Sequence, residues 1–101
     1  LNISKNSVSV EIEKANYQGE ATLWLMAVEP KVLQKIQKGE NAGKDITNVN
    51  VVKNLIPAAM WSGEAYKGSW MRDVVMTKGT QHVIAVLQEG KTGKLLGLAQ
   101  A

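Results

Sequence analysis

The chain has 101 residues, no cysteine, and a net charge of +3 from 12 basic and 9 acidic side chains. The missing cysteines exclude disulfides, thiolate metal sites and cysteine nucleophiles, and the 45% hydrophobic content is that of a single folded domain over residues 1–101. The lysines are dispersed and Arg72 is the single arginine, so nucleic acid is not an expected partner. The longest apolar run, residues 23–28, is too short to span a bilayer.

Two strands are predicted in the first third of the chain. Residues 7–13 alternate, with Val8, Val10 and Ile12 on one face, as in a half-buried antiparallel strand. Residues 21–29 are apolar on both faces, which predicts a central strand that places Trp24 in the core and ends at Pro30, with a short helix as the weaker alternative.

Residues 31–38 fit two structures. Val32, Leu33 and Ile36 have the spacing of a helix, and Pro30 could occupy its first turn. A strand, which would place Val32, Gln34 and Ile36 on one face, is the other interpretation, so both the helix and the strand stay open for Val32 to Ile36.

A long strand is predicted for residues 48–56, followed by an irregular crossing over residues 58–66. The alternation places five residues on one face of this strand: Asn48, Asn50, Val52, Asn54 and Ile56. Pro57 weakens the end of the strand, because proline cannot donate a ladder hydrogen bond.

The last third of the chain reads as three strands separated by turns. Strands are predicted over residues 70–76, 81–88 and 95–101, with a turn at 78–80, a hairpin loop at 89–94 and a bulge near Gly97. Together the elements predict an all-β fold. It is an antiparallel β-sandwich of about six or seven strands, immunoglobulin- or fibronectin-like, with room for one short helix.

The aromatic residues offer one candidate binding surface. If Trp61, Tyr66 and Trp70 were exposed, they could stack on a sugar or a peptide, and Asn48 and Asn50 could add hydrogen bonds. The competing interpretation is that the tryptophans fill the core, because the chain contains no phenylalanine.

No catalytic set is recognisable, and neither a cofactor nor a metal is expected. His82, the single histidine, has no local serine and aspartate partners, so a structural role is favoured over a hydrolase triad. Asp45, Asn48 and Asn50, with Glu40 and Asn41, could supply oxygen ligands to Ca²⁺, but their spacing fits no calcium loop. Turn and backbone hydrogen bonds explain these side chains better.

One segment is specific enough to suggest a family. Residues 39–43 read Gly-Glu-Asn-Ala-Gly, and residues 47–55 follow as Thr-Asn-Val-Asn-Val-Val-Lys-Asn-Leu. Trp61 and Gly63, and the terminal strand Gly-Lys-Leu-Leu-Gly-Leu-Ala at 93–99, continue the match. The chain resembles the carboxy-terminal, β-rich part of the bacterial secreted family called domain of unknown function 1223. Asn48 and Lys53 depart from it, since the family often has His and Arg there.

The resemblance implies a context for the chain. In that family a thioredoxin-like domain with a Cys-x-x-Cys-type motif precedes the β-rich part, so we expect this chain to be a piece excised from a longer periplasmic or secreted protein. Its expected partner is that domain. The expected role is a non-catalytic accessory domain that packs on the redox-type domain or presents substrate to it. The alternatives are an independent peptide- or glycan-binding module and a hydrolase built around His82.

Overall fold

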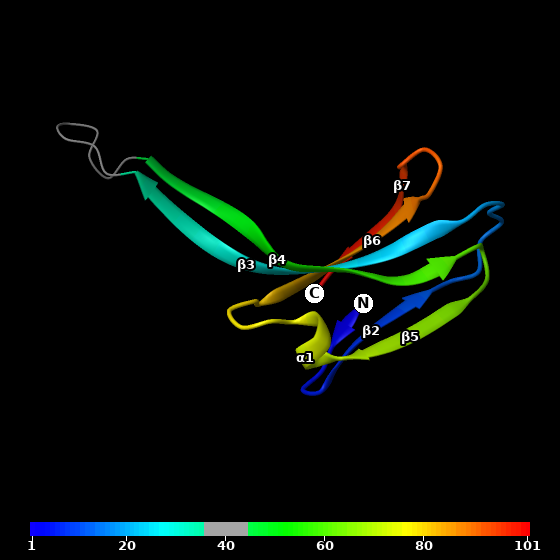
Figure 1. Cartoon of the computed structure of the whole chain (residues 1–101), viewed down its shortest axis with the longest axis horizontal. Coiled ribbons are helices and arrows are strands. Elements are labelled where there is room, and N and C mark those ends of the chain that lie inside the picture. The colour runs from blue at the N-terminus through cyan, green and yellow to red at the C-terminus, as the bar shows by residue number, and fades with distance from the viewer. Residues whose placement is uncertain (36–44) are drawn as a thin grey trace.

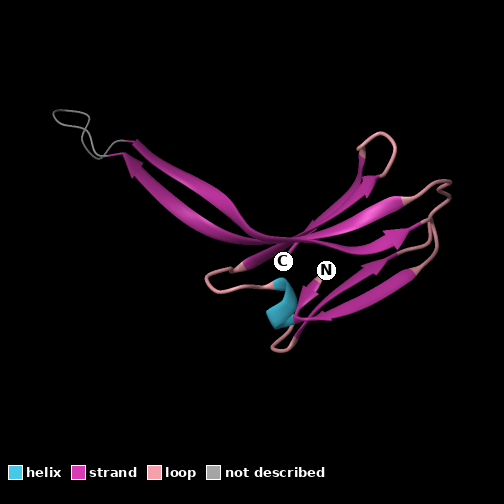
Figure 2. Ribbon diagram, viewed as in Figure 1, coloured by secondary structure: helices cyan, strands magenta, loops and turns pink. Residues whose placement is uncertain are grey.

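The computed structural model consists of two antiparallel sheets stacked face to face (Figures 1 and 2). It describes the backbone of residues 1–35 and 45–101 and the side chains of residues 1–31 and 49–101. The described residues form seven strands and one short helix: β1 (Asn2–Ile3), β2 (Ser7–Ile12), β3 (Ala21–Lys35), β4 (Asp45–Trp61), β5 (Tyr66–Met71), α1 (Arg72–Val75), β6 (His82–Glu89) and β7 (Leu95–Gln100). The small sheet has the order β1-β2-β5 and the large sheet the order β4-β3-β6-β7. The predicted all-β antiparallel sandwich is confirmed.

The core lies between the inner faces of the two sheets. Alternation along β2 turns Val8 and Val10 inward, and alternation along β3 and β6 does the same for Leu23, Leu25 and Val83. Trp61 at the end of β4 and Val75 of α1 close the two ends of this cluster. Because the core uses every second residue of each strand, the residues between them form the two outer faces of the sandwich.

Several predicted elements are confirmed. The alternating segment at 7–13 is β2, the segment at 81–88 is β6, and residues 21–29 form the inner part of β3, which has neighbours on both sides. Gly79 and Gly93 have positive φ in the predicted turn and hairpin loop. The register between β6 and β7 shifts beside Gly97, where a bulge was predicted.

Both prolines that were expected to end or weaken a strand lie inside one. Pro30 pairs with Asn50 and Pro57 pairs with Trp24. Proline is tolerated here because β4 is an edge strand, and because β3 pairs with β4 alone beyond Val28, which faces the first residue of β6. The strand interpretation of residues 31–35 is therefore correct for the backbone, whereas Ile36 and the 39–43 turn lie outside the described residues.

The short helix occurs where a strand was predicted, at residues 70–76. β5 stops at Met71, and the next N–H, that of Arg72, donates to the Asn6 carbonyl at 2.9 Å. The Met76 N–H then donates to the Arg72 carbonyl at 2.7 Å, which closes one helical turn. This turn places Val75 in the core, a burial that alternation along a strand did not anticipate.

Two bulges in β4 divide the predicted asparagine face. Relative to β3, the register shifts at Lys53 and at Ala58, so each of these residues has no direct partner. An extra residue inverts the alternation, and Asn50 and Asn54 therefore lie on opposite faces of the sheet. Asn54 points inward, and its Nδ2 donates to the carbonyls of Val74 at 3.1 Å and Val75 at 3.0 Å. This amide ties the large sheet to the end of α1.

Substituting Asn54 by alanine should lower the free energy of unfolding by about 1–3 kcal/mol, because two carbonyls of α1 would lose their donor. Asn50→Ala is the matched control, since Asn50 is exposed and should change stability by less than about 0.5 kcal/mol. Urea denaturation of both variants measures the difference. Equal stabilities of the two variants would show that the amide does not hold α1.

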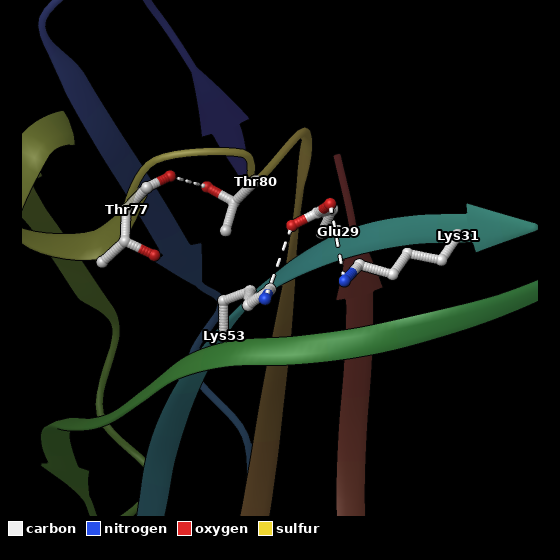
Figure 3. A network of polar contacts seen from close by, with 5 residues as sticks. All are labelled: Glu29, Lys31, Lys53, Thr77 and Thr80. Atoms are coloured by element: carbon white, nitrogen blue, oxygen red, sulfur yellow. Dashed lines mark hydrogen bonds and ion pairs between the residues drawn. The ribbon is translucent and has the colours of Figure 1, made fainter.

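Beyond Val28 and Val52, the two longest strands form an arm. This arm consists of residues 29–35 of β3 paired with residues 45–51 of β4, and it projects past the sandwich (Figure 1). At its root, Glu29 lies 4.0 Å from the Lys31 ammonium and 3.7 Å from that of Lys53, beside the Thr77–Thr80 turn (Figure 3). The turn approaches closely, since a Cβ on Gly79 would lie 2.8 Å from the Glu29 carboxylate.

Candidate interaction surface

The outer face of the large sheet is apolar. Residues paired directly across an antiparallel sheet share a face, so the register defines three rows on it. The rows are Pro57-Trp24-Val86-Leu98, Leu55-Met26-Ile84-Gln100 and Met60-Thr22-Gln88-Leu95. These rows contain no charged residue. We call these twelve residues the outer apolar face.

Several side chains of this face are open to solvent. Leu55, Met60 and Leu98 expose 51%, 58% and 69% of their surface, and Leu95 is similarly exposed. The small sheet shows the opposite pattern, because its outer face carries Ser9 paired with Ser69 and Glu11 paired with Lys67. The Lys67 ammonium lies 3.9 Å from the Glu11 carboxylate. Met71 is the exposed apolar exception on the outer face of the small sheet, which is otherwise polar, whereas the outer face of the large sheet is mainly apolar.

Trp24 belongs to the outer apolar face, which corrects its predicted place in the core. Its neighbours Leu23 and Leu25 are both buried in the core cluster, so the alternation of β3 turns Trp24 outward, where it is half-buried. The sequence signal was present, since residues 21–29 are apolar on both faces. That pattern predicts a strand covered on both sides, whereas the described residues cover one side only.

Trp61, one of the predicted ligand residues, is buried, at 4% exposure. Its ring stacks on that of Tyr17, with centroids 5.5 Å apart and planes 9° from parallel. Its Nε1 donates to the Glu64 carbonyl at 2.6 Å. Trp61 thus closes one end of the sandwich by joining β4 to the loop between β2 and β3.

Tyr66 and Trp70 lie on the inner face of β5, since they pair with Ile12 and Val8. Both rings are half-buried and pack against the core. They converge over Gly68 between them, where an added Cβ would approach the Tyr66 hydroxyl and the Trp70 ring within 3 Å. The glycine thus leaves room for two aromatic rings that face the interior.

Asn48 and Asn50 are located in the arm, where they pair with Val32 and Pro30. Asn50 is exposed. The structure brings Tyr66 and Trp70 together but places neither asparagine beside them, since the aromatics belong to the small sheet and the asparagines to the arm. Ligand binding by these residues stays a prediction.

His82, Glu64 and Tyr17 are three further titratable residues of the chain. His82 begins β6 opposite Val28. The backbone N–H of Glu64 and the Ser62 hydroxyl, 2.8 Å away, hold the pKa of the Glu64 carboxyl below its usual range. Burial, followed by the Glu89 carboxylate, raises the pKa of the Tyr17 hydroxyl. Among the side chains that the structure describes, those of residues 1–31 and 49–101, no group of three or more His, Asp or Glu could hold a metal ion.

Comparison with known proteins gives a family and no characterised relative. Residues 2–88 match the family model described as "Protein of unknown function (DUF1223)". No curated protein and no solved structure matches the chain. In the part of the chain that the structure describes, no helix has the length and apolar character needed to cross a membrane.

Proposed function

Since this chain belongs to the DUF1223 family of proteins of unknown function, we propose a role that its surface supports best: a non-catalytic accessory domain that packs on a thioredoxin-like domain of the same parent protein. The contact is made through the outer apolar face. In this proposal the parent protein is periplasmic or secreted, as the family resemblance implies.

The observation that carries the proposal is the charge-free outer face of the large sheet. Antiparallel sheets that face water alternate apolar and polar residues, as the small sheet does with Ser9, Glu11 and Lys67. A contiguous apolar face on a small domain is typical of a surface that another protein covers. Trp24 at its centre belongs to the residue types that dominate binding energy, and its neighbour Met26 to those enriched at interfaces.

The position of Leu1 favours a domain of the same chain as the occupant. Leu1 and Leu98 line the same hollow at the side of the sandwich, so a segment entering at Leu1 arrives beside the outer apolar face. A covalent link makes docking intramolecular, which gives a high effective concentration at the surface without a tight intrinsic affinity. An upstream domain can therefore cover this face even if the connector before Leu1 is short.

The alternative, an independent peptide- or glycan-binding module, has less support. Trp61 is in the core, and Tyr66 and Trp70 turn toward the interior. Trp61 is buried and the other two are half-buried, so the three rings together leave less surface for stacking on a sugar.

The test is binding between this chain and the thioredoxin-like domain of its parent, expressed separately and followed by titration calorimetry. The double variant Leu55→Lys/Leu98→Lys should weaken the complex roughly 30-fold or more, because two ammonium groups would enter an apolar contact. Both side chains are more than half exposed, so the melting temperature should change little.

The matched control is Ser9→Lys/Ser69→Lys on the outer face of the small sheet, which should bind as the parent sequence does. Equal loss in both double variants, or none in either, would refute the proposed face. A homodimer of this chain that only the Leu55/Leu98 variant disrupts would identify a second copy as the occupant and overturn the thioredoxin-like partner.

A further inference from the structure

The small sheet has an edge that is only partly paired. β2 runs over Ser7–Ile12 and pairs with β5 along its whole length, but β1 pairs only with Val8 and Ser9. Within the described residues, no strand lies beyond Ser9 on the β1 side of β2. The last half of β2 therefore has a partner on one side only.

The register of β1 is firmly set by the turn that follows it. The Ser4 N–H donates to the Ser7 carbonyl at 2.8 Å, the Ser7 N–H donates to the Ser4 hydroxyl at 3.1 Å, and the two hydroxyls lie 2.8 Å apart. Since Asn2 pairs with Ser9, Leu1 stands opposite Val10. Any residues that precede Leu1 would next pass Glu11, Ile12 and Glu13.

The peptide groups at the open edge of β2 are oriented so that they can pair with a further strand. The Ser7 carbonyl faces β1, because it accepts the Ser4 N–H. The Asn6 carbonyl faces β5, because it accepts the Arg72 N–H. Peptide groups of alternate residues point to the same side of a strand, so the N–H and carbonyl of Glu11 face the open edge.

A hollow beside this edge reaches the core. Its volume is about 330 Å³, and its apolar walls include Val10, Ile12, Leu23, Ala85, Leu87 and Ala99. Ala85 and Leu87 belong to the core cluster, so the sandwich is open at this side. Glu11 on β2 and Glu13, which follows the end of β2, are exposed and also contribute to the rim of this hollow. The Glu11 carboxylate lies 3.9 Å from the Lys67 ammonium.

We propose that the open edge of β2 is the docking site of the connector that joins this domain to the thioredoxin-like domain, an inference that rests on the proposed function. The last three residues before Leu1 extend β1 in antiparallel pairing with β2. The residue opposite Ile12 is apolar and fills the hollow, and its two neighbours, opposite Glu11 and Glu13, are basic or polar. Cross-strand pairs of opposite charge favour the basic choice.

The pairing would have a mechanical consequence for the parent protein. A connector hydrogen-bonded into the sheet has no flexible segment next to Leu1, so the preceding domain is held at a fixed position beside the outer apolar face. The two surfaces would then act together, one fixing the connector and the other covering the partner.

The experiment adds three residues before Leu1 of this chain and compares three extensions. Lys-Val-Lys should raise the melting temperature by roughly 4 °C or more relative to Gly-Ser-Gly, and should slow hydrogen exchange of the Glu11 amide. Lys-Val-Pro places proline opposite Glu11, where it cannot donate to the ladder, and should lose both effects.

Equal melting temperatures for Lys-Val-Lys and Gly-Ser-Gly would overturn the proposal. So would a higher melting temperature without protection of the Glu11 amide, or an equal effect of Lys-Val-Pro. None of these results bears on the titration of the Leu55 and Leu98 variants with the thioredoxin-like domain. Failure of the connector site and failure of the proposed function are therefore distinguishable.

Discussion

Replacement of Trp61 by alanine is expected to lower the free energy of unfolding by about 3–5 kcal/mol. The ring is buried in the core, stacks on Tyr17, and donates its Nε1 hydrogen to the Glu64 carbonyl. Its loss leaves a cavity at the end of the sandwich and a carbonyl without its donor. Domains of this size have a total stability of about 5–15 kcal/mol, so this loss would be a large part of the stability of the domain.

Two control variants separate the causes. Trp61→Phe keeps an aromatic ring against Tyr17 and loses only the Nε1 hydrogen bond and some volume. Its free energy of unfolding should therefore decrease clearly less than that of Trp61→Ala. Met60→Ala changes the preceding residue, which is mostly exposed, and should cost less than about 1 kcal/mol. Urea denaturation gives all three values. A Trp61→Ala protein as stable as Met60→Ala would mean that the ring is not part of the core.

Substituting Gly63 by alanine is expected to have the second large effect, a decrease of about 2–3 kcal/mol in the free energy of unfolding. Gly63 has φ of +105°, which residues with a side chain rarely adopt. An added Cβ would also lie 2.8 Å from the Tyr17 carbonyl oxygen and 3.0 Å from that of Ala15. Both contacts are with backbone atoms, which cannot rotate away, and the Gly63 carbonyl already accepts the Ala15 N–H at 2.9 Å.

Gly90→Ala serves as the matched substitution for Gly63→Ala. Gly90 has no positive φ, and the nearest atom to an added Cβ is the Glu20 carbonyl oxygen at 3.5 Å. The urea midpoint for unfolding of the Gly90→Ala variant should remain close to that of the unsubstituted chain. A Gly63→Ala midpoint equal to that of Gly90→Ala would disprove the close approach of the 62–65 loop to Tyr17.

Periodicity in the sequence predicts the regular part of this fold. β2 and β6 follow from strict alternation, and the hairpin between β6 and β7 follows from its glycines. These strands are governed by local pattern because each has one face in the core. The family was also identified correctly, as the family match over residues 2–88 shows, and this match includes residues 39–55, Trp61 and Gly63 but not the terminal strand.

The places where sequence reasoning failed share a physical cause. The bulges at Lys53 and Ala58, and the tolerance of Pro30 and Pro57, depend on which strand edges are open. Edge exposure is a property of the whole sheet, and no local pattern reports it. The face of Asn54 was therefore assigned wrongly.

The candidate surface was missed for a related reason. Trp24 and Trp61 each follow an apolar residue, and only the register shows that Trp24 points out and Trp61 points in. The outer apolar face takes residues from four strands that are distant in sequence. The signal that could have found it is the doubly apolar pattern of residues 21–29, which requires a cover on both sides.

Thiol labelling of single-cysteine variants tests the covered outer face most directly, because the chain has no cysteine of its own. Leu98→Cys reports on the outer apolar face, and Ser69→Cys reports on the outer face of the small sheet. Each is placed in this chain alone and in the intact parent protein, with the cysteines of its thioredoxin-like domain replaced. If the outer apolar face is covered, the thiol of the Leu98→Cys variant should react roughly tenfold more slowly in the intact protein than in this chain alone. This factor corresponds to a protection of about 1.4 kcal/mol. The thiol of the Ser69→Cys variant should react equally fast in both proteins. Equal reactivity of the Leu98→Cys thiol in both proteins would contradict the proposal.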